Sequence, residues 1–143
     1  MTQNLTAMRP KRPSLYRLAA DGRSLDFLFA QCPHCKGLSF PANVPGCMHC
    51  GALLDKAEQV ALAGGGALLE YVTLHVPMAP GMAVPSIAGD IRIADQVVEE
   101  GVIAVADESA LHPGMAMKAV AVPLDSGDIF DCRFVPASEG AAK

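Results

Sequence analysis

The chain has 143 residues, of which 51% are hydrophobic and 18% are charged, with a formal net charge of −4 at pH 7. This length fits one ordinary domain, or a small metal-stabilised module joined to a compact second domain. The hydrophobic content excludes a wholly disordered chain, because such chains combine few apolar residues with a high net charge.

The first thirteen residues predict an extended basic arm. Arg9, Lys11 and Arg12 lie next to Pro10 and Pro13, and a residue that precedes proline is disfavoured in a helix. The arm has no apolar stretch of the kind found in signal peptides, so we expect none. Short basic runs are more typical of a solvated or partner-facing tail than of a phosphate site.

A short helix is predicted for residues 14–20. Ser14 is a good N-cap, and apolar residues recur after it at helical spacing. From residue 24 the pattern changes to the alternation of a strand, with Leu25, Phe27 and Phe29 on one side. This strand leads directly into a pair of cysteines.

Four cysteines form the most specific motif, Cys32-Pro-His-Cys35 and Cys47-Met-His-Cys50, with eleven residues between the pairs. Each C-x-x-C pair lets two sulfurs converge from one tight turn. Two such turns that face each other make a tetrahedral thiolate cage, the geometry that Zn²⁺ prefers. We therefore predict a zinc ribbon with Cys32, Cys35, Cys47 and Cys50 as its metal ligands.

The predicted metal is structural, because four thiolates leave no position for a water or a substrate. His34 and His49 lie inside the spacers, but four thiolates make them unnecessary as ligands. A redox C-x-x-C is disfavoured, since it expects one pair at the start of a helix. Iron in the same sulfur cage stays open as an alternative to zinc. Reduced cysteines also predict a cytoplasmic protein.

Beyond residue 58, short strands alternate with Gly- and Pro-rich breaks, which is typical of a small antiparallel barrel or sandwich. Residues 71–89 lack Lys, Arg, Asp and Glu, but their three prolines exclude a membrane-spanning helix, so no membrane contact is expected. The expected strands are 58–63, 67–76, 87–94, 97–105, 117–123 and 129–135, with breaks at 64–66, 77–85, 100–101, 112–114 and 126–127.

The sequence offers little catalytic machinery. Cys132 is the only cysteine outside the metal motif, and a nucleophilic thiolate needs a base beside it. His75 and His112 are the candidate bases, and both are distant in the sequence. We predict no catalytic residue, and the cofactor-binding residues stay undefined.

Residues 77–85 form an apolar loop with two methionines and three prolines. Such a loop predicts contact with a partner protein or an acyl chain, because Met adapts to irregular surfaces and exposed apolar patches usually mark contacts. Packing over the chain's own core is the alternative.

Charge and aromatic content disfavour nucleic-acid binding. Residues 1–54 hold six basic and two acidic residues, whereas residues 55–143 hold five basic and thirteen acidic residues. The acidic part would repel phosphates, and Tyr71, Phe130 and Phe134 are its only aromatic residues for base stacking.

The order of these features resembles the zinc-ribbon/OB-fold proteins that accompany acyl-CoA enzymes. The resemblance covers roughly residues 14–136. It rests on Cys32-Pro-His-Cys35, Cys47-Met-His-Cys50-Gly51, the strand at 69–75, the loop at 77–85, His112-Pro-Gly114 and Phe134-Val-Pro136.

This resemblance implies a mainly β fold with a short N-terminal helix, a rubredoxin-like zinc ribbon and a five-stranded OB-type antiparallel barrel. The expected parts are the arm and helix (1–23), the ribbon (24–55), the barrel (56–136) and a flexible tail (137–143).

The implied function is that of a non-catalytic, zinc-binding subunit in a hetero-oligomer with a larger thiolase-fold catalytic subunit. The acyl-CoA thioester would bind at or near the interface. The chain looks most like the small subunit of aromatic-pathway thiolases, such as the benzoylsuccinyl-CoA type of anaerobic benzylsuccinate degradation. The alternatives are an accessory subunit of a hot-dog-fold enoyl-CoA hydratase and a free-standing nucleic-acid-binding ribbon/OB module.

Overall fold

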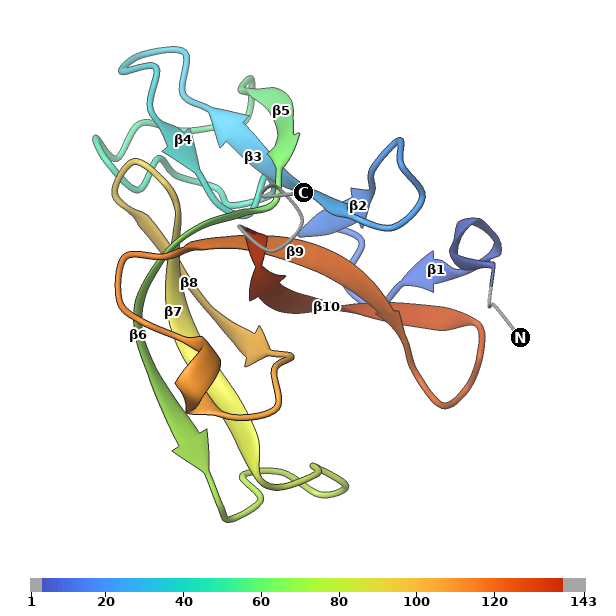
Figure 1. Cartoon of the computed structure of the whole chain (residues 1–143). Coiled ribbons are helices and arrows are strands. Elements are labelled where there is room, and N and C mark those ends of the chain that lie inside the picture. The colour runs from blue at the N-terminus through green and yellow to red at the C-terminus, as the bar shows by residue number, and fades with distance from the viewer. Residues whose placement is uncertain (1–3, 138–143) are drawn as a thin grey trace. The chain divides into compact units, whose positions relative to one another are not determined.

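The computed structural model describes residues 4–137, which fold almost entirely into strands and turns (Figure 1). The mainly β prediction is therefore confirmed. The described residues divide into two compact units, one with residues 4–64 and 121–131, the other with residues 65–120 and 132–137. Apart from Ala137, the predicted tail lies outside the described residues.

The first unit contains a four-stranded antiparallel sheet of β2 (Tyr16–Leu18), β3 (Leu25–Gln31), β4 (Leu38–Ser39) and β5 (Glu58–Ala63). The ends of β3 pair with β2 and β4 along one edge, while β5 runs beside β3 along the other (Figure 1). Apolar side chains alternate along β3, which explains why this segment forms a strand. They make the core of this unit, and Leu25, Phe27 and Phe29 are at most 2% exposed.

The helix predicted at residues 14–20 is wrong, because Tyr16–Leu18 is strand β2. Tyr16 is buried, packs 6.2 Å from Phe130 between ring centroids, and donates its hydroxyl hydrogen bond to Asp131 at 2.9 Å. These contacts outweigh the propensity of a seven-residue helix, which is marginal without tertiary support.

The basic arm is ordered by pairing rather than left free. A short 3-10 helix, η1 (Leu5–Ala7), precedes β1 (Arg9–Pro10). Strand β1 runs parallel to the start of β10 (Ile129–Pro136), where Lys11 donates its backbone N–H to the carbonyl of Phe130 at 2.8 Å. Arg9 and Asp128 also form an exposed ion pair at 3.5 Å.

A five-stranded closed barrel follows, made of β6 (Gly65–Leu74), β7 (Ser86–Ala94), β8 (Val97–Ile103), β9 (Ala116–Pro123) and β10. The first three strands form an antiparallel meander. The first strand also pairs with the fourth, the third pairs in parallel with the fifth, and β9–β10 closes the ring. This is the topology of an OB-type barrel, so that prediction is confirmed as well.

Two facing glycines make room inside the barrel. Gly89 of β7 is the register partner of Gly101 of β8. A Cβ at Gly101 would stand 2.4 Å from the ring of Phe134, and one at Gly89 would stand 2.6 Å from Ile103. The break predicted at residues 100–101 is therefore wrong, because Gly101 continues β8 and serves packing instead of a turn.

The six strands expected after residue 58 correspond to β5 through β10, with ends displaced by at most two residues. A second 3-10 helix, η2 (Glu108–Ala110), lies in the connection between β8 and β9. In the part of the chain that the structure describes, no helix is long and apolar enough to cross a membrane.

Candidate metal centre

The two cysteine pairs lie in turns with the same backbone pattern. In the first turn Cys32 donates its N–H to Gly37 and accepts one from Lys36, both at 2.9 Å. In the second turn the matching bonds join Cys47 to Ala52 at 2.8 Å and to Gly51 at 2.9 Å. Each turn needs a left-handed residue at the same place, which Lys36 (φ 69°) and Gly51 (φ 81°) supply.

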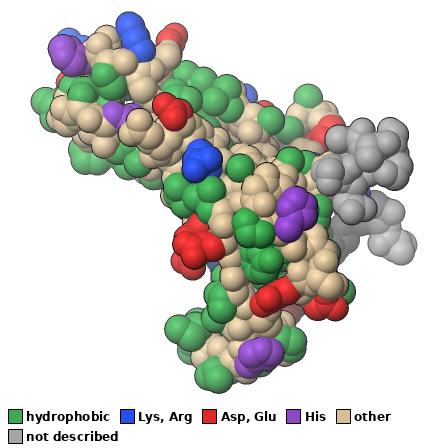
Figure 2. Space-filling view, turned by 60° about the vertical axis from the view of Figure 1, so that its left-hand side comes forward, with side chains coloured by type: hydrophobic (Ala, Val, Ile, Leu, Met, Phe, Trp, Pro, Cys, Tyr) green, Lys and Arg blue, Asp and Glu red, His purple; other side chains and the backbone are tan. Residues whose placement is uncertain are grey.

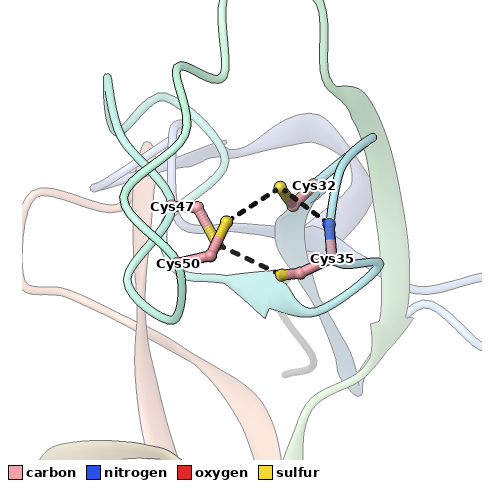
Figure 3. A group of neighbouring side chains, drawn as sticks. All are labelled: Cys32, Cys35, Cys47 and Cys50. Carbon is pink, nitrogen blue, oxygen red and sulfur yellow. Dashed lines mark hydrogen bonds between the residues drawn. The ribbon is translucent and has the colours of Figure 1, made fainter.

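These turns bring the four sulfur atoms together (Figure 3). All four Sγ atoms lie within 4.8 Å of one another, with Cys32–Cys50 at 3.7 Å and Cys35–Cys47 at 3.6 Å. A tetrahedral ion with Zn–S distances of about 2.3 Å places its sulfurs about 3.8 Å apart. The four predicted ligands are thus positioned to bind a metal ion.

Backbone N–H groups stabilise thiolates at Cys32 and Cys47, the two buried cysteines of the cluster. The N–H of Cys35 donates to Cys32 Sγ at 3.4 Å and lowers the pKa of Cys32 below its usual 9.0, against the effect of burial. Burial raises the pKa of Cys47, but donation from the N–H groups of Cys50 and His49 outweighs it and lowers the pKa to about 6. Such donors favour the charged form, which is the form that binds metal.

The pKa of Cys50 shifts in the opposite direction. The N–H of Ala52 favours a thiolate at Cys50, but loss of hydration and the neighbouring sulfurs raise its pKa to about 11. Four negative charges cannot gather here without a counter-charge. A divalent cation supplies that charge, so the donor set fits a tetrahedral thiophilic ion.

The sulfur cluster lies at the edge of a small core of its own. Cys32 and Cys47 are buried with Ala30 and Leu54, while Cys35 and Cys50 are exposed. A structural ion needs no deeper burial, because its four ligands already exclude water from the first coordination sphere.

Ser39 supports the second turn and was not predicted. Its side chain is fully buried, and its Oγ accepts a hydrogen bond from the N–H of Met48 at 2.9 Å. Met48 follows Cys47 directly, so this bond fixes the start of the second cysteine turn. A serine in the middle of the Leu38–Phe40 segment gives no local indication of such a long-range role.

The histidines in the spacers lie outside the candidate ligand group found among the described residues. His49 Nε2 lies 2.5 Å from the carbonyl oxygen of Leu38, and the ring packs against Gly37, where a Cβ would stand 2.8 Å from His49 Cδ2. The His49 side chain, which belongs to the second turn, therefore contacts the backbone just after the first turn and links the two turns.

The residues considered for catalysis lie on separate elements. Cys132 is half-buried in β10, His75 is exposed after β6, and His112 Nδ1 lies 3.2 Å from the carbonyl of its neighbour Pro113. The expectation that the chain has no catalytic residue stays a prediction.

The loop at residues 77–85 ends the β6–β7 hairpin as an exposed apolar tip (Figure 2, lower end of the view). Val76 and Met78 are 69% and 74% exposed, and Val84 is 38% exposed. The N–H of Met78 lies 3.3 Å from the sulfur of Met82, which braces the loop internally. Exposure on this scale argues against the alternative that the loop folds back over the core.

A shallow depression on the outside of the barrel is acidic. Its volume is about 140 Å³, and Glu70, Asp90 and Glu100 line it from three neighbouring strands. Small-molecule sites usually measure about 300–1,000 Å³ and are mostly apolar. This depression is therefore too small and too polar to hold an acyl-CoA.

The similarity to known proteins lies in the fold. No protein-family model matches the chain. The search of curated proteins gives no match to the sequence either. A chain of the solved Ltp2-ChsH2(DUF35) aldolase superposes with a TM-score of 0.62 and 23% sequence identity, over 78% of this chain and 85% of that one. At this identity the likeness shows that the two chains share a fold.

Proposed function

We propose that this chain is a non-catalytic, zinc-binding subunit of an enzyme complex that acts on acyl-CoA thioesters. The observation that carries the proposal is a closed four-sulfur cluster joined in one chain to an OB-type barrel, a fold shared with a chain of an aldolase. Zinc here is structural, and its binding contributes on the order of 10 kcal/mol to folding of the ribbon.

The partner in this proposal is a larger, thiolase-fold catalytic subunit. The structural neighbour is an aldolase whose name joins two components, Ltp2 and ChsH2(DUF35), which supports a role in a hetero-oligomer. Aldolases and thiolases both form or break a carbon–carbon bond next to a carbonyl group. The benzoylsuccinyl-CoA thiolase of benzylsuccinate degradation remains the proposed type, and the cytoplasm remains the proposed location.

The partner supplies the reacting groups. The sulfur cluster has no open coordination position, and the acidic depression is too small for an acyl-CoA. In this account the present chain orders the partner and contributes part of the wall of the CoA or acyl channel. Its exposed hairpin tip, with Val76 and Met78, is the surface that we assign to contact with the partner.

Charge on the barrel argues against the nucleic-acid alternative. OB-fold proteins bind oligonucleotides over their second and third strands, which here are β7 and β8. Asp90 and Glu100 lie opposite each other on these strands, and their carboxylates would repel phosphates.

Tagged full-length chain purified from its native host at moderate salt tests the proposal. We expect co-purification with a larger chain, and carbon–carbon bond cleavage or formation on an acyl-CoA by the complex. We expect no turnover by the isolated chain, and no nucleic acid bound in place of the protein partner. If the partner has a hot-dog fold and the complex hydrates enoyl-CoA, the hydratase alternative holds instead of the thiolase. Turnover by the isolated chain, or a complex without any acyl-CoA enzyme, would contradict the proposal.

A further inference from the structure

Strand β5 forms an open edge of the first unit's sheet. It pairs with β3 over six consecutive residues, from Glu58 opposite Gln31 to Ala63 opposite Asp26, without a register shift. No other strand in the described part of the chain pairs with β5 (Figure 1). The opposite edge of β3 is occupied by only short strands, of three and two residues.

The hydrogen-bond alternation shows which groups of β5 point outward. The N–H of Gly64 donates to the carbonyl of Leu25 at 2.8 Å, so this pair faces β3. In an antiparallel ladder every second residue bonds to the same neighbour. Residues 58, 60 and 62 therefore bond to β3, and Gln59, Ala61 and Ala63 direct their N–H and C=O groups to the open edge.

This edge lacks the usual features that prevent pairing with another strand. Exposed edges are commonly protected by lysine, proline or a bulge. Strand β5 has none of these, and its last four residues, from Val60 to Ala63, are small or apolar and uncharged. Leu62 is 40% exposed, which leaves apolar surface beside the free backbone groups.

We propose that β5 pairs with β5 of a second copy of this chain, antiparallel, with the two-fold axis at Ala61. In this register Ala61 faces Ala61 of the second copy, and Gln59 faces Ala63. Val60 then faces Leu62 and covers its exposed surface. The two Glu58 side chains lie six residues apart along the ladder, about 20 Å, and do not repel each other strongly.

Neighbouring registers are less favourable. Moving the axis to Gln59 places Leu62 opposite Lys56 and sets two Gln59 side chains against each other. The register centred on Ala61 pairs five of the six strand residues with one another, from Gln59 to Ala63, and sets Leu62 against Val60. Moving the axis to Val60 would set Leu62 against Glu58. Moving it to Leu62 would leave only the three residues 61–63 paired within the strand. A pair of six-residue strands is smaller than the roughly 1,200–2,000 Å² of stable interfaces, so the dimer is reversible and depends on concentration.

Sedimentation velocity on the full-length, zinc-loaded chain tests this inference across micromolar to millimolar concentrations. We expect a monomer–dimer equilibrium. Amide hydrogen exchange at Gln59, Ala61 and Ala63 should slow as the dimer fills, while Val60 and Leu62 stay protected at all concentrations. A wild-type chain that stays monomeric at millimolar concentration would overturn the inference.

Substitutions at Ala61 test the register. Ala61→Pro removes only an outward N–H and should raise the dimer dissociation constant about thirtyfold, because the two-fold axis makes one change remove two hydrogen bonds. Ala61→Ser keeps the N–H and is the matched control. A dimer that survives Ala61→Pro unchanged would show that another surface pairs.

A charge-swap experiment covers the case in which the proline variant misfolds. Ala61→Lys and Ala61→Glu each place two like charges face to face, which should weaken self-association about fivefold. An equimolar mixture should regain association as a heterodimer. Association that is equally strong in all three samples would overturn the proposed axis. Because these experiments use this chain alone, their outcome is independent of the proposed enzyme partner.

Discussion

Gly101 lies directly against the ring of Phe134, so closely that a Cβ would stand 2.4 Å from Phe134 Cε2. The two residues belong to β8 and β10, strands that pair in parallel through Ile103 and Phe134. Phe134 is 2% exposed and is among the largest side chains in the barrel core. The glycine therefore provides the space that this aromatic side chain fills.

Gly101→Ala should destabilise the barrel by about 1–3 kcal/mol, because the added methyl group overpacks the site. Thermal unfolding followed by circular dichroism measures the change. Replacing the ring with a smaller side chain in the double variant Gly101→Ala/Phe134→Leu should recover part of the lost stability. Gly46→Ala is the control, since its Cβ would meet nothing closer than 3.9 Å. Equal stability of Gly101→Ala and wild type would contradict the packing account.

Tyr16→Phe should destabilise the first unit by about 1.5–3 kcal/mol, because a buried hydroxyl loses its bond to the Asp131 carboxylate. Urea unfolding measures the loss. Tyr71→Phe provides the comparison: its hydroxyl bonds a neutral carbonyl, that of Leu111, at 3.3 Å and should cost less. If the two variants were equally stable, the strand assignment at residues 16–18 would lose its energetic explanation.

Ser39→Ala should weaken zinc affinity about tenfold to hundredfold, as expected when a group that positions a metal ligand is removed. The substitution leaves the N–H of Met48 without its acceptor beside Cys47. Competition with a chromogenic chelator measures the affinity. His34→Ala changes an exposed spacer residue and should bind zinc like wild type. Equal affinity of the Ser39→Ala and wild-type chains would show that this bond does not position the ligand.

Zinc binding at pH 7 should release fewer than four protons per ion when the metal-free ribbon is folded, because an unfolded ribbon has four thiols near the usual pKa of 9.0 and would release close to four. In the folded, metal-free ribbon the pKa of Cys47 is lowered to about 6, so this group is mostly a thiolate at pH 7. The pKa of Cys50 is raised to about 11, so this thiol must lose its proton when the ion binds. Calorimetric titration in buffers with different ionisation enthalpies counts the protons.

The same pKa values determine how the metal-free ribbon responds to pH. Because the folded pKa of Cys47 lies below the unfolded value of 9.0, its contribution to stability is present above pH 9 and is lost as pH falls through 6. The raised pKa of Cys50 contributes with the opposite sign, and its stabilisation is lost as pH rises from 9 toward 11. For the zinc titration of the folded ribbon, release of four protons per ion at pH 7 would contradict the lowered pKa of Cys47.

Local patterns predicted the clustering of the four cysteines and the positions of most strands. The four cysteines of the cluster follow from the C-x-x-C spacing alone, because each pair is a self-contained turn. Strands β5 to β10 follow from alternation and from Gly and Pro at their ends. The apolar hairpin tip around Met78 is likewise visible in the sequence as a charge-free stretch. It is exposed in the structure, and its contact with a partner stays a prediction.

Contacts between distant residues could not be predicted in this way. The pairing of β1 with β10 joins Arg9 to Ile129, far apart in the sequence. Tyr16 becomes a strand residue because Phe130 and Asp131 hold it, which no local pattern indicates. The break predicted at Gly101 is wrong because glycine usually marks turns, whereas here it accommodates a side chain from another strand.

The central claim is that one ion, held by Cys32, Cys35, Cys47 and Cys50, organises the ribbon as a structural centre. Native mass spectrometry of the purified chain tests it directly. We predict one zinc ion per chain in wild type and in Cys132→Ser, and loss of the ion with local unfolding in Cys47→Ser. A folded wild-type chain without stoichiometric metal, or a Cys47→Ser variant that keeps its ion and its fold, would contradict the claim.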